Sequence, residues 1–323
     1  MSDDLIDIPF EVWPEEHGIR ADRFLSKRIK RMSRSKAAAL IREGVVRREE
    51  GPPIDRPAVR VMAGDRVLLK RKKLGEAPID DIELPVEYED DDLLAVNKPG
   101  DLVVHPTASA YHRTVIRVLR ARRPGEFLEL GHRIDKETSG LLILAKSESA
   151  DVYLKNAFAD RRVKKSYLAI VAGAPKEDRF TVDAPMRLSP SARSGVRMEI
   201  GGADAQPAIT EIEVRARGEQ AALVEARPLT GRQHQIRLHL AHAGHPIVGD
   251  KLYLGGDELF IRAIREQLGR EELSGLIGHW RHALHAHAAT FEHPRTRAPI
   301  TLQAALAPDL AELAVRLGLS PAG

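Results

Sequence analysis

The sequence contains no cysteine among its 323 residues, which excludes disulfide bonds and metal sites built from thiolates. It has no window approaching eighteen consecutive apolar residues, so a membrane-spanning helix is excluded as well. The first residues, MSDDLIDIPF, are acidic and lack a long apolar segment, so no signal peptide is visible. These absences predict a soluble, cytoplasmic protein that does not bind a membrane.

Several enzyme motifs are also missing. There is no phosphate-binding G-x-x-x-x-G-K-[ST] loop, no dinucleotide-binding G-x-G-x-x-G sequence and no G-x-S-x-G nucleophile elbow. Nothing therefore indicates a dinucleotide site, and Ser139 lacks the elbow that would make it a nucleophile. The length favours two domains or one large one, which is ample for a full apolar core.

Charge is unevenly distributed along the chain, although the net charge is only +3. Residues 1–19 carry six acids and no Lys or Arg, whereas residues 20–73 carry eighteen Lys or Arg and six Asp or Glu. Residues 76–92 then carry nine acids and no Lys or Arg. A basic block between two acidic segments is typical of a surface that binds polyanions. The alternative is a solvated basic face without a partner.

The basic block also has a regular apolar pattern. Its spacing predicts two short helices, Ala21–Ile29 and Ser33–Glu43. Ser33 is a suitable N-cap for the second helix, and Gly44 is a suitable stop. Val59–Leu69, with a Gly-Asp turn in its middle, is predicted to form strands. The polar face of the second helix is the expected contact with a polyanion and carries Arg34, Lys36 and Arg42.

The stretch Gly131–Lys146, GHRIDKETSGLLILAK, joins a charged loop to the short apolar run Leu141–Ala145. Such a run indicates a strand buried on both faces, although periodicity alone is also compatible with a buried helix. Charges beside a buried strand are costly unless they are paired or have a function. The plain structural alternative is a surface ion pair between Arg133 and Asp135.

Other segments have clear patterns as well. Residues 93–106, LLAVNKPGDLVVHP, predict two strands around a Lys-Pro-Gly turn. Ser149–Arg161 fits a helix, and Lys164–Gly173 fits a strand. Asp257–Leu268 is predicted to be an inserted helix, whose role the sequence does not reveal. Pro308–Leu319 is expected to form a terminal amphipathic helix.

The second informative block begins with a predicted strand, Ala222–Ala226. Thr230 and Gln233, three residues apart, match a capping box. A helix is therefore expected over Gly231–Gly244. Arg237 lies on this helix, and the pattern alone makes it a structural salt-bridge residue.

Eight of the thirteen histidines fall in two clusters. Their spacing of three and four residues can place imidazoles on one helix face, as a zinc site requires. No H-E-x-x-H pattern occurs, so a metal-dependent hydrolase would rest on the histidines alone. We expect no metal site and a structural role for His285. The clusters are His234, His239, His242 and His245, followed by His279, His282, His285 and His287.

The motif HRIDKETSGLLILAK resembles the signature of the RluA-type pseudouridine synthases, in which His-Arg-hydrophobe-Asp precedes Thr-Ser-Gly and apolar residues. The resemblance implies that Asp135 is the catalytic carboxylate. GRQHQIRLH and GHPIVGD are similar to a later motif of the family, which places Arg237 at the arginine that pairs with this aspartate. In the family, a tyrosine at the position of Tyr167 reaches the target base. The implied fold is α+β, with a mixed, mainly antiparallel central sheet, flanking helices and a cleft across the sheet.

The basic block resembles the small RNA-binding domain named after a small-subunit ribosomal protein, through GIRADRFL, SRSKAAALIREGVV and VMAGDRVLL. The two resemblances together divide the chain into five parts. In chain order these are an acidic N-terminal arm (1–17), a small basic RNA-binding domain (18–75), an acidic linker (76–85), the catalytic domain (86–308) and a C-terminal helix (309–323).

Pseudouridine formation detaches a uracil from its ribose, turns the base and joins the sugar to ring carbon 5. It involves no redox change, so no cofactor is expected. An ionised carboxylate can trap or stabilise an oxocarbenium-like centre, or it can remove the 2′ proton and pass through a glycal. Arg237 would keep Asp135 ionised and oriented. A flipped uridine leaves a gap that Arg133 can occupy, and Tyr167 is expected to stack on the base.

The sequence therefore predicts a cytoplasmic, monomeric RNA pseudouridine synthase that acts on large-subunit ribosomal RNA. Transfer RNA is the alternative substrate. The alternative class is a non-catalytic RNA-binding protein that uses only the basic domain. The presence of both Asp135 and Arg237 argues against that class, because binding alone does not need such a pair.

Overall fold

The structure is a computed structural model, and its backbone forms two compact units, residues 1–77 and residues 78–323, which we describe separately. In the part of the chain that is described, no helix is long and apolar enough to cross a membrane. The described residues are 5–29, 32–72, 79, 81–106 and 113–319.

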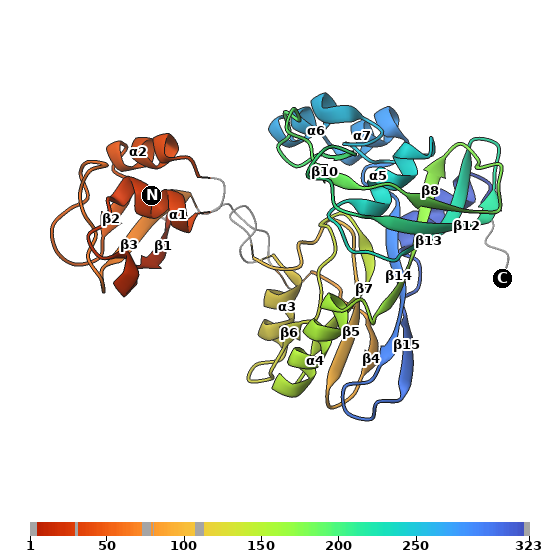
Figure 1. The fold of residues 1–323 in the computed structure, drawn as a ribbon, viewed down its shortest axis with the longest axis horizontal. Coiled ribbons are helices and arrows are strands. Elements are labelled where there is room, and N and C mark those ends of the chain that lie inside the picture. Colours follow the sequence, from red (N-terminus) through yellow and green to blue (C-terminus); the bar gives the residue numbers. More distant parts are fainter. Residues whose placement is uncertain (1–4, 30–31, 73–78, 80, 107–112, 320–323) are drawn as a thin grey trace. The chain divides into compact units, whose positions relative to one another are not determined.

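The first unit, in red and orange in Figure 1, contains a three-stranded antiparallel sheet and two α-helices. Its elements are β1 (Leu5–Glu11), the short 3-10 helix η1 (Pro14–Glu16), α1 (Ala21–Arg28), α2 (Arg34–Arg42), β2 (Val46–Arg48) and β3 (Arg66–Lys72). The strand order is β1-β3-β2. A single apolar core joins the helices to the sheet and includes Phe24 of α1, Ile41 of α2 and Val67 of β3.

Two expectations for this unit were wrong. The segment expected to be a separate acidic arm, residues 1–17, contributes β1, which pairs along its whole length with β3. Of the strands predicted over Val59–Leu69, the part after the Gly-Asp turn belongs to β3, which begins at Arg66, whereas the part before the turn forms only an isolated bridge at Arg60. The backbone of Val59 and Val61 bonds instead with the residues that enter α1, so these residues are not available to pair with a strand.

The second unit is built on a ten-stranded sheet. Its strands are β4 (Val86–Glu89), β5 (Leu93–Lys98), β6 (Glu129–Leu130), β7 (Ser139–Ala145), β8 (Lys164–Ala172), β9 (Arg179–Asp183), β12 (Ile209–Arg217), β13 (Ala221–Pro228), β14 (Leu284–Glu292) and β15 (Pro299–Gln303). Its helices are α3 (Val115–Arg122), α4 (Glu148–Ala159), α5 (Gln235–His242), α6 (Gly256–Arg265), α7 (Arg270–Ile277) and α8 (Pro308–Arg316). A separate hairpin is formed by β10 (Met186–Leu188) and β11 (Met198–Ile200).

The sheet has the order β4-β5-β7-β14-β8-β13-β12-β9, with β15 beside β14 and β6 beside β7. Among the strands described, β7 and β14 form a parallel pair, and the other neighbours in this sheet are antiparallel. Figure 1 shows the sheet with its flanking helices. This architecture confirms the predicted α+β fold with a mixed, mainly antiparallel sheet.

Strand β7 is buried along its whole length. Leu141 and Ile143 pack in a core with α4, whereas Leu142 and Leu144 pack in a second core with α3. Because apolar layers cover both faces, no residue of the strand needs to be polar, which explains the continuous apolar run. The predicted strand over Leu141–Ala145 is confirmed.

Two segments before β7 differ from the prediction. Residues 93–106 contain one strand, β5, which ends at Lys98. Leu102 packs into the core of α3 and is not part of a second strand. Residues 76–85 were expected to be only a linker, but Ile82 and Leu84 are buried in that same core. Burial of their apolar side chains removes them from water, so this end of the acidic segment belongs to the second unit.

The C-terminal helix α8 is amphipathic, as predicted, but it is not a separate part of the chain. Leu310 and Leu313 lie in the apolar core that contains β8 and β13. The helix predicted over Asp257–Leu268 is α6, and a second helix, α7, follows it before β14.

Candidate active site

The loop that carries Asp135 runs from β6 to β7. Thr138 N–H donates to the Asp135 carbonyl at 3.2 Å and tightens the end of the loop. Gly140 follows with a φ of +105°, and a Cβ at this position would collide with the Ala286 carbonyl of β14. Glycine therefore allows the close approach of β7 and β14 that fixes where the loop ends.

His132 holds the beginning of the loop. Its ring stacks on Phe158 with centroids 4.6 Å apart, and its Nε2 accepts the Ile143 N–H at 3.2 Å. This bond requires an unprotonated Nε2. Burial, and after it the charge of Lys165, lowers the pKa of His132 to about 3, so the ring is neutral at physiological pH.

Two further histidines hold the end of the loop from β14 and the segment before it. Thr138 Oγ1 lies 2.8 Å from His282 Nε2, and Ser139 Oγ lies 3.0 Å from His285 Nδ1. Both rings are buried, and burial lowers the pKa of each below its usual value. His285 has the structural role that we expected.

A buried lysine ties the loop to the segment after β5. Lys98 Nζ donates to the carbonyls of Pro99 at 2.8 Å and of Leu102 and Lys136 at 2.9 Å. An ammonium has three N–H donors, so these bonds use all of them. Burial lowers the pKa of Lys98 to about 7. Lys98 thus fixes the backbone of the residue next to Asp135.

A buried arginine ties the same loop to α8. Arg281 has no exposed surface, and its Nη1 donates to the Glu137 carbonyl at 2.8 Å. Its Nε and Nη2 donate to the two carboxylate oxygens of Asp309 at 2.7 and 2.8 Å. The C-terminal helix is therefore coupled to the loop by one fully buried side chain.

Arg237 approaches the loop from α5. The predicted capping box is not formed: α5 begins at Gln235, because His234 has a left-handed φ of +57°. Thr230 Oγ1 donates to Gln235 Oε1 at 2.8 Å and accepts the Ile209 N–H at 3.1 Å, so it does not cap a backbone N–H of α5. The shorter helix still brings Arg237 to the site.

The central contact of the site joins two carboxylates through one guanidinium. Arg237 Nη1 lies 3.2 Å from Asp135 Oδ2, while its Nε and Nη2 donate to Asp250 at 2.6 and 2.9 Å. Asp250 is fully buried, whereas the Asp135 side chain is 38% exposed. Bidentate pairing with Asp250 fixes the plane of the guanidinium, so Nη1 is directed at Asp135. The exposed carboxylate is left facing the solvent.

Charge stabilises this cluster against the cost of burial. Burial opposes both charges of the inner pair, but Arg237 holds the pKa of Asp250 below its usual range. Asp250 and Asp135 in turn raise the pKa of Arg237 above its usual value, although burial opposes this shift. Both inner groups therefore stay charged, and the three side chains together carry one net negative charge.

Tyr167 and Arg133 lie in different surroundings. Tyr167 is on β8, opposite Ala226 on one side and Ala286 on the other. Burial, followed by the negative charge of Asp135, raises the pKa of Tyr167 to about 12, so its phenol is neutral. Arg133 is exposed and forms no hydrogen bond or ion pair with any residue that the structure describes. The surface pair of Arg133 with Asp135 is therefore not formed.

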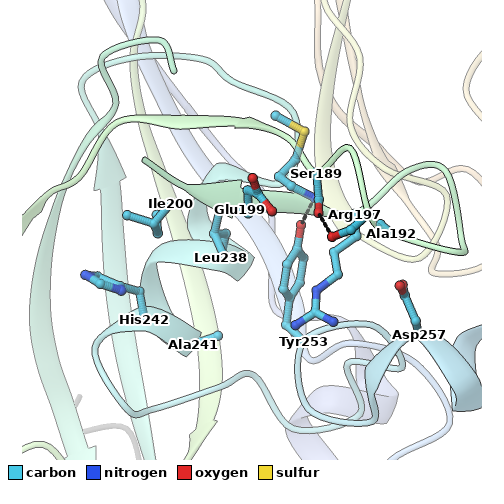
Figure 2. Close-up of a pocket in the computed structure, with 12 residues that line it drawn as sticks. Ser189, Ala192, Arg197, Glu199, Ile200, Leu238, Ala241, His242, Tyr253 and Asp257 are labelled. Carbon is cyan, nitrogen blue, oxygen red and sulfur yellow. Dashed lines mark hydrogen bonds between the residues drawn. The ribbon is translucent and has the colours of Figure 1, made fainter. Parts of the chain in front are cut away.

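Tyr253 connects the site to a surface pocket of about 500 Å³. Its hydroxyl accepts the Met198 N–H at 3.0 Å, and its ring centroid lies 5.2 Å from Arg237 Cζ. Figure 2 shows the Tyr253 side chain reaching from its loop to the β10–β11 hairpin. The other labelled residues of the pocket are Ser189, Ala192, Arg197, Glu199, Ile200, Leu238, Ala241, His242 and Asp257.

The predicted RNA-binding residues lie on the first unit. Arg34, Lys36 and Arg42 are all on α2, and all three are exposed. Arg34 Nε pairs with Asp22 Oδ2 at 3.0 Å, so α1 restrains this side chain. Ser33 caps α2 as predicted, because its Oγ accepts the Lys36 N–H at 3.1 Å.

The clustered histidines do not assemble into a metal site in the part of the chain that is described. One group of three potential ligands comes together there, namely Asp90, Asp92 and His293. These groups have protein partners, since His293 Nε2 lies 2.8 Å from Asp90 and Asp92 pairs with Arg295 at 2.6 Å. The geometry gives the metal-dependent hydrolase no support.

Sequence reasoning missed four residues around Asp135: Asp250, Tyr253, Lys98 and Arg281. Asp250 ends the segment GHPIVGD, and Lys98 lies in the Lys-Pro-Gly turn, so both fall in segments that the sequence singles out. No local spacing, however, indicates that Asp250 pairs with Arg237 or that Lys98 bonds to the carbonyl of Lys136.

Known proteins resemble this chain in sequence. Residues 92–242 match the family model described as RNA pseudouridylate synthase. A relative from Haemophilus ducreyi named "Ribosomal large subunit pseudouridine synthase C" is 35% identical over 319 residues, covering 95% of each chain. A relative from Zymomonas mobilis named "Ribosomal large subunit pseudouridine synthase D" is 33% identical and covers 91% of this chain and 92% of the relative.

Solved structures show the same similarity. "Human RNA Pseudouridylate Synthase Domain Containing 4" matches with a TM-score of 0.57 and 27% identity, over 72% of this chain and 92% of that chain. "Human RNA Pseudouridylate Synthase Domain Containing 1" matches with a TM-score of 0.55 and 26% identity, over 77% of this chain and 99% of that chain.

Proposed function

The chain belongs to the RluA-type family of pseudouridine synthases, and on this premise we propose that it isomerises uridines of large-subunit ribosomal RNA with Asp135 as the catalytic carboxylate. The single observation that carries the role of Asp135 is its position: a part-exposed carboxylate at the end of a buried Arg237–Asp250 pair. The choice of RNA is supported by the names of the relatives from Haemophilus ducreyi and Zymomonas mobilis.

The proposed chemistry needs an ionised carboxylate beside the ribose of the target nucleotide. Asp135 either attacks the anomeric carbon as the bond to uracil breaks, or removes the 2′ proton so that a glycal forms. Arg237 orients the carboxylate in both routes through the 3.2 Å contact. Asp250 and Lys98 are positioning residues, because they act through Arg237 and through the backbone next to Asp135.

The remaining site residues are assigned to the base and to the RNA helix. Tyr167, whose neutral phenol lies within the electrostatic influence of Asp135, stacks on the flipped uracil and assists proton exchange at carbon 5. Arg133 is exposed beside Asp135 and occupies the gap that the flipped base leaves. The first unit adds affinity through the exposed Arg34, Lys36 and Arg42 of α2. Because one chain supplies every residue of the site, we propose that the protein acts as a monomer. We also propose that it acts in the cytoplasm.

Mapping pseudouridines across total RNA, in cells with and without this gene, tests the proposal. We expect individual sites in large-subunit ribosomal RNA to lose the modification, and to regain it with the wild-type gene but not with Asp135→Asn. Loss confined to transfer RNA would show that the substrate is wrong. An unchanged map in all RNA would contradict the activity itself.

A further inference from the structure

A lysine that the proposed chemistry does not use lies between the two loops of the site. Lys165 precedes Tyr167 by two residues on β8, so the two side chains lie on the same face of the strand. Its Nζ lies 3.6 Å from the position that a Cβ on Gly231 would occupy, in the loop before α5. Its charge also acts on His132, in the loop that carries Asp135. Lys165 therefore reaches the place where the two loops meet.

This ammonium has no counter-charge in the described part of the protein. Its Nζ forms no hydrogen bond or ion pair there, and burial lowers the pKa of Lys165. The other lysines near the loop are bonded: Lys98 Nζ meets three carbonyls, and Lys251 Nζ donates to Glu137 at 2.7 Å. A half-buried cation without a partner destabilises the folded protein, so a contribution to folding does not explain Lys165.

The surroundings leave the ammonium open to a ligand. Gly231 is exposed and has no side chain, so at this position the loop presents only backbone to the Lys165 ammonium. The cluster of Asp135, Arg237 and Asp250 has two carboxylates for one guanidinium, so it offers no free cation to a phosphate that accompanies a flipped uridine. The Lys165 ammonium, which has no carboxylate partner among the described residues, can bind a phosphate of the RNA backbone.

We propose that Lys165 binds a backbone phosphate that flanks the target uridine and so offsets the negative charge of the catalytic cluster. This inference rests on the proposed function, because it requires an RNA nucleotide at Asp135. The phosphate supplies the missing acceptor, and pairing with it recovers the free energy lost by desolvating the ammonium.

The test compares Lys165→Met with Lys164→Met in the full-length protein. Lys164 is the matched control because it is exposed and points to the opposite face of β8. We expect Lys165→Met to weaken RNA binding about tenfold or more, to raise KM more than it lowers kcat, and to reduce the salt slope of binding by about one. Lys165→Arg should restore most of the affinity. Equal affinity and salt slope in the two methionine variants would overturn the inference.

Neutral methylphosphonate linkages identify the contact. One RNA carries the neutral linkage on the 5′ side of the target uridine, and a second RNA carries it on the 3′ side. One of the two linkages should weaken binding by the wild-type protein and by Lys164→Met. The same linkage should have almost no further effect on Lys165→Met, because the pair is already broken. Additive losses at both positions would overturn the inference and assign Lys165 to another group of the RNA, such as a uracil carbonyl.

Stability and activity separate the remaining outcomes. Because Lys165 is unpaired, the melting temperature of Lys165→Met without RNA should equal or exceed that of the wild-type protein, and a clear decrease would make Lys165 a structural residue. If the wild-type protein forms no pseudouridine in RNA, the proposed function fails and this inference fails with it. An active wild-type protein whose binding is insensitive to Lys165→Met would overturn this inference alone.

Discussion

At the residue scale, the site depends on how one guanidinium is divided between two carboxylates. Arg237 gives its Nε and Nη2 to Asp250, which is fully buried, and its Nη1 to Asp135, which is part-exposed. A lysine at this position would keep the charge but could not hold both partners in one plane. The orientation of Asp135 therefore depends indirectly on Asp250, which acts through Arg237.

Asp250→Asn should lower both stability and activity. The change leaves the buried Arg237 charge without its inner partner, which typically costs about 3–5 kcal/mol of unfolding free energy. The rate should fall as well, because the guanidinium is no longer fixed. Urea unfolding and single-turnover rates measure the two effects. Asp178→Asn is the control, since Asp178 pairs with Arg217 at 2.7 Å on the surface and should change stability by less than about 1 kcal/mol. Equal behaviour of the two variants would refute the role of Asp250.

Because of its buried histidines, we expect the protein to lose stability at pH values well above the pKa values of its carboxylates. In the unfolded chain a histidine binds a proton near pH 6.5, but burial keeps these rings neutral in the folded protein down to about pH 4 or below. Unfolding therefore takes up protons in this window, and the unfolding free energy decreases as pH falls from 6.5 towards 4, by up to about 1.4 kcal/mol per pH unit for each ring. Urea unfolding at pH 7, 6 and 5 measures this, and equal stability at all three would contradict it. The rings concerned are His132, His234, His279, His282 and His285.

At the scale of elements, the sequence pattern predicted the elements whose formation depends on residues close together in the chain. The apolar run Leu141–Ala145 has no polar alternation, and the structure buries it between two helices. The start of α5 was predicted wrongly because Thr230 bonds to the side chain of Gln235, which competes with a backbone cap. That choice depends on the tertiary environment and not on the spacing.

The site was predictable only where a motif marked it. The structure brings Asp135 and Arg237 together across about a hundred residues, as the resemblance implied. Asp250 was missed because a single aspartate after a glycine has no periodic signature. Its function arises from burial next to α5, which the sequence alone does not specify.

Gly140→Ala should disrupt the joint between β7 and β14. A Cβ at this position would collide with the backbone of Ala286, and the φ of +105° is unfavourable for alanine. We expect a loss of about 2 kcal/mol or more in unfolding free energy, with a loss of activity because the Asp135 loop ends at this strand. Gly275→Ala, inside α7 with open space around it, is the control and should be neutral or slightly stabilising. Unchanged stability in Gly140→Ala would contradict the packing described.

At the scale of the whole molecule, the chain divides its tasks between two units with separate apolar cores. The first contains the basic block, and the second contains every residue assigned to the chemistry. We therefore expect affinity for RNA and turnover to respond to different changes.

A protein that lacks residues 1–75 tests this division. It should form pseudouridine at saturating RNA, because the catalytic cluster is intact. Its RNA affinity should decrease, and its salt dependence should become shallower because phosphate contacts are lost. Filter binding at several salt concentrations, together with single-turnover rates, measures both properties. The same affinity and salt slope as the full-length protein would show that the first unit is not an RNA anchor.

The most direct test of the account is the turnover of purified Asp135→Asn. The substitution keeps the size of the side chain and removes its charge, so RNA affinity and stability should change little. Release of tritium from RNA that carries 5-tritiated uridine reports the new bond at carbon 5, and mass spectrometry of the protein excludes deamidation back to aspartate. The account predicts no release above background by Asp135→Asn under conditions in which the wild-type protein completes the reaction. Measurable turnover by the intact variant would contradict the central claim that Asp135 is the catalytic carboxylate.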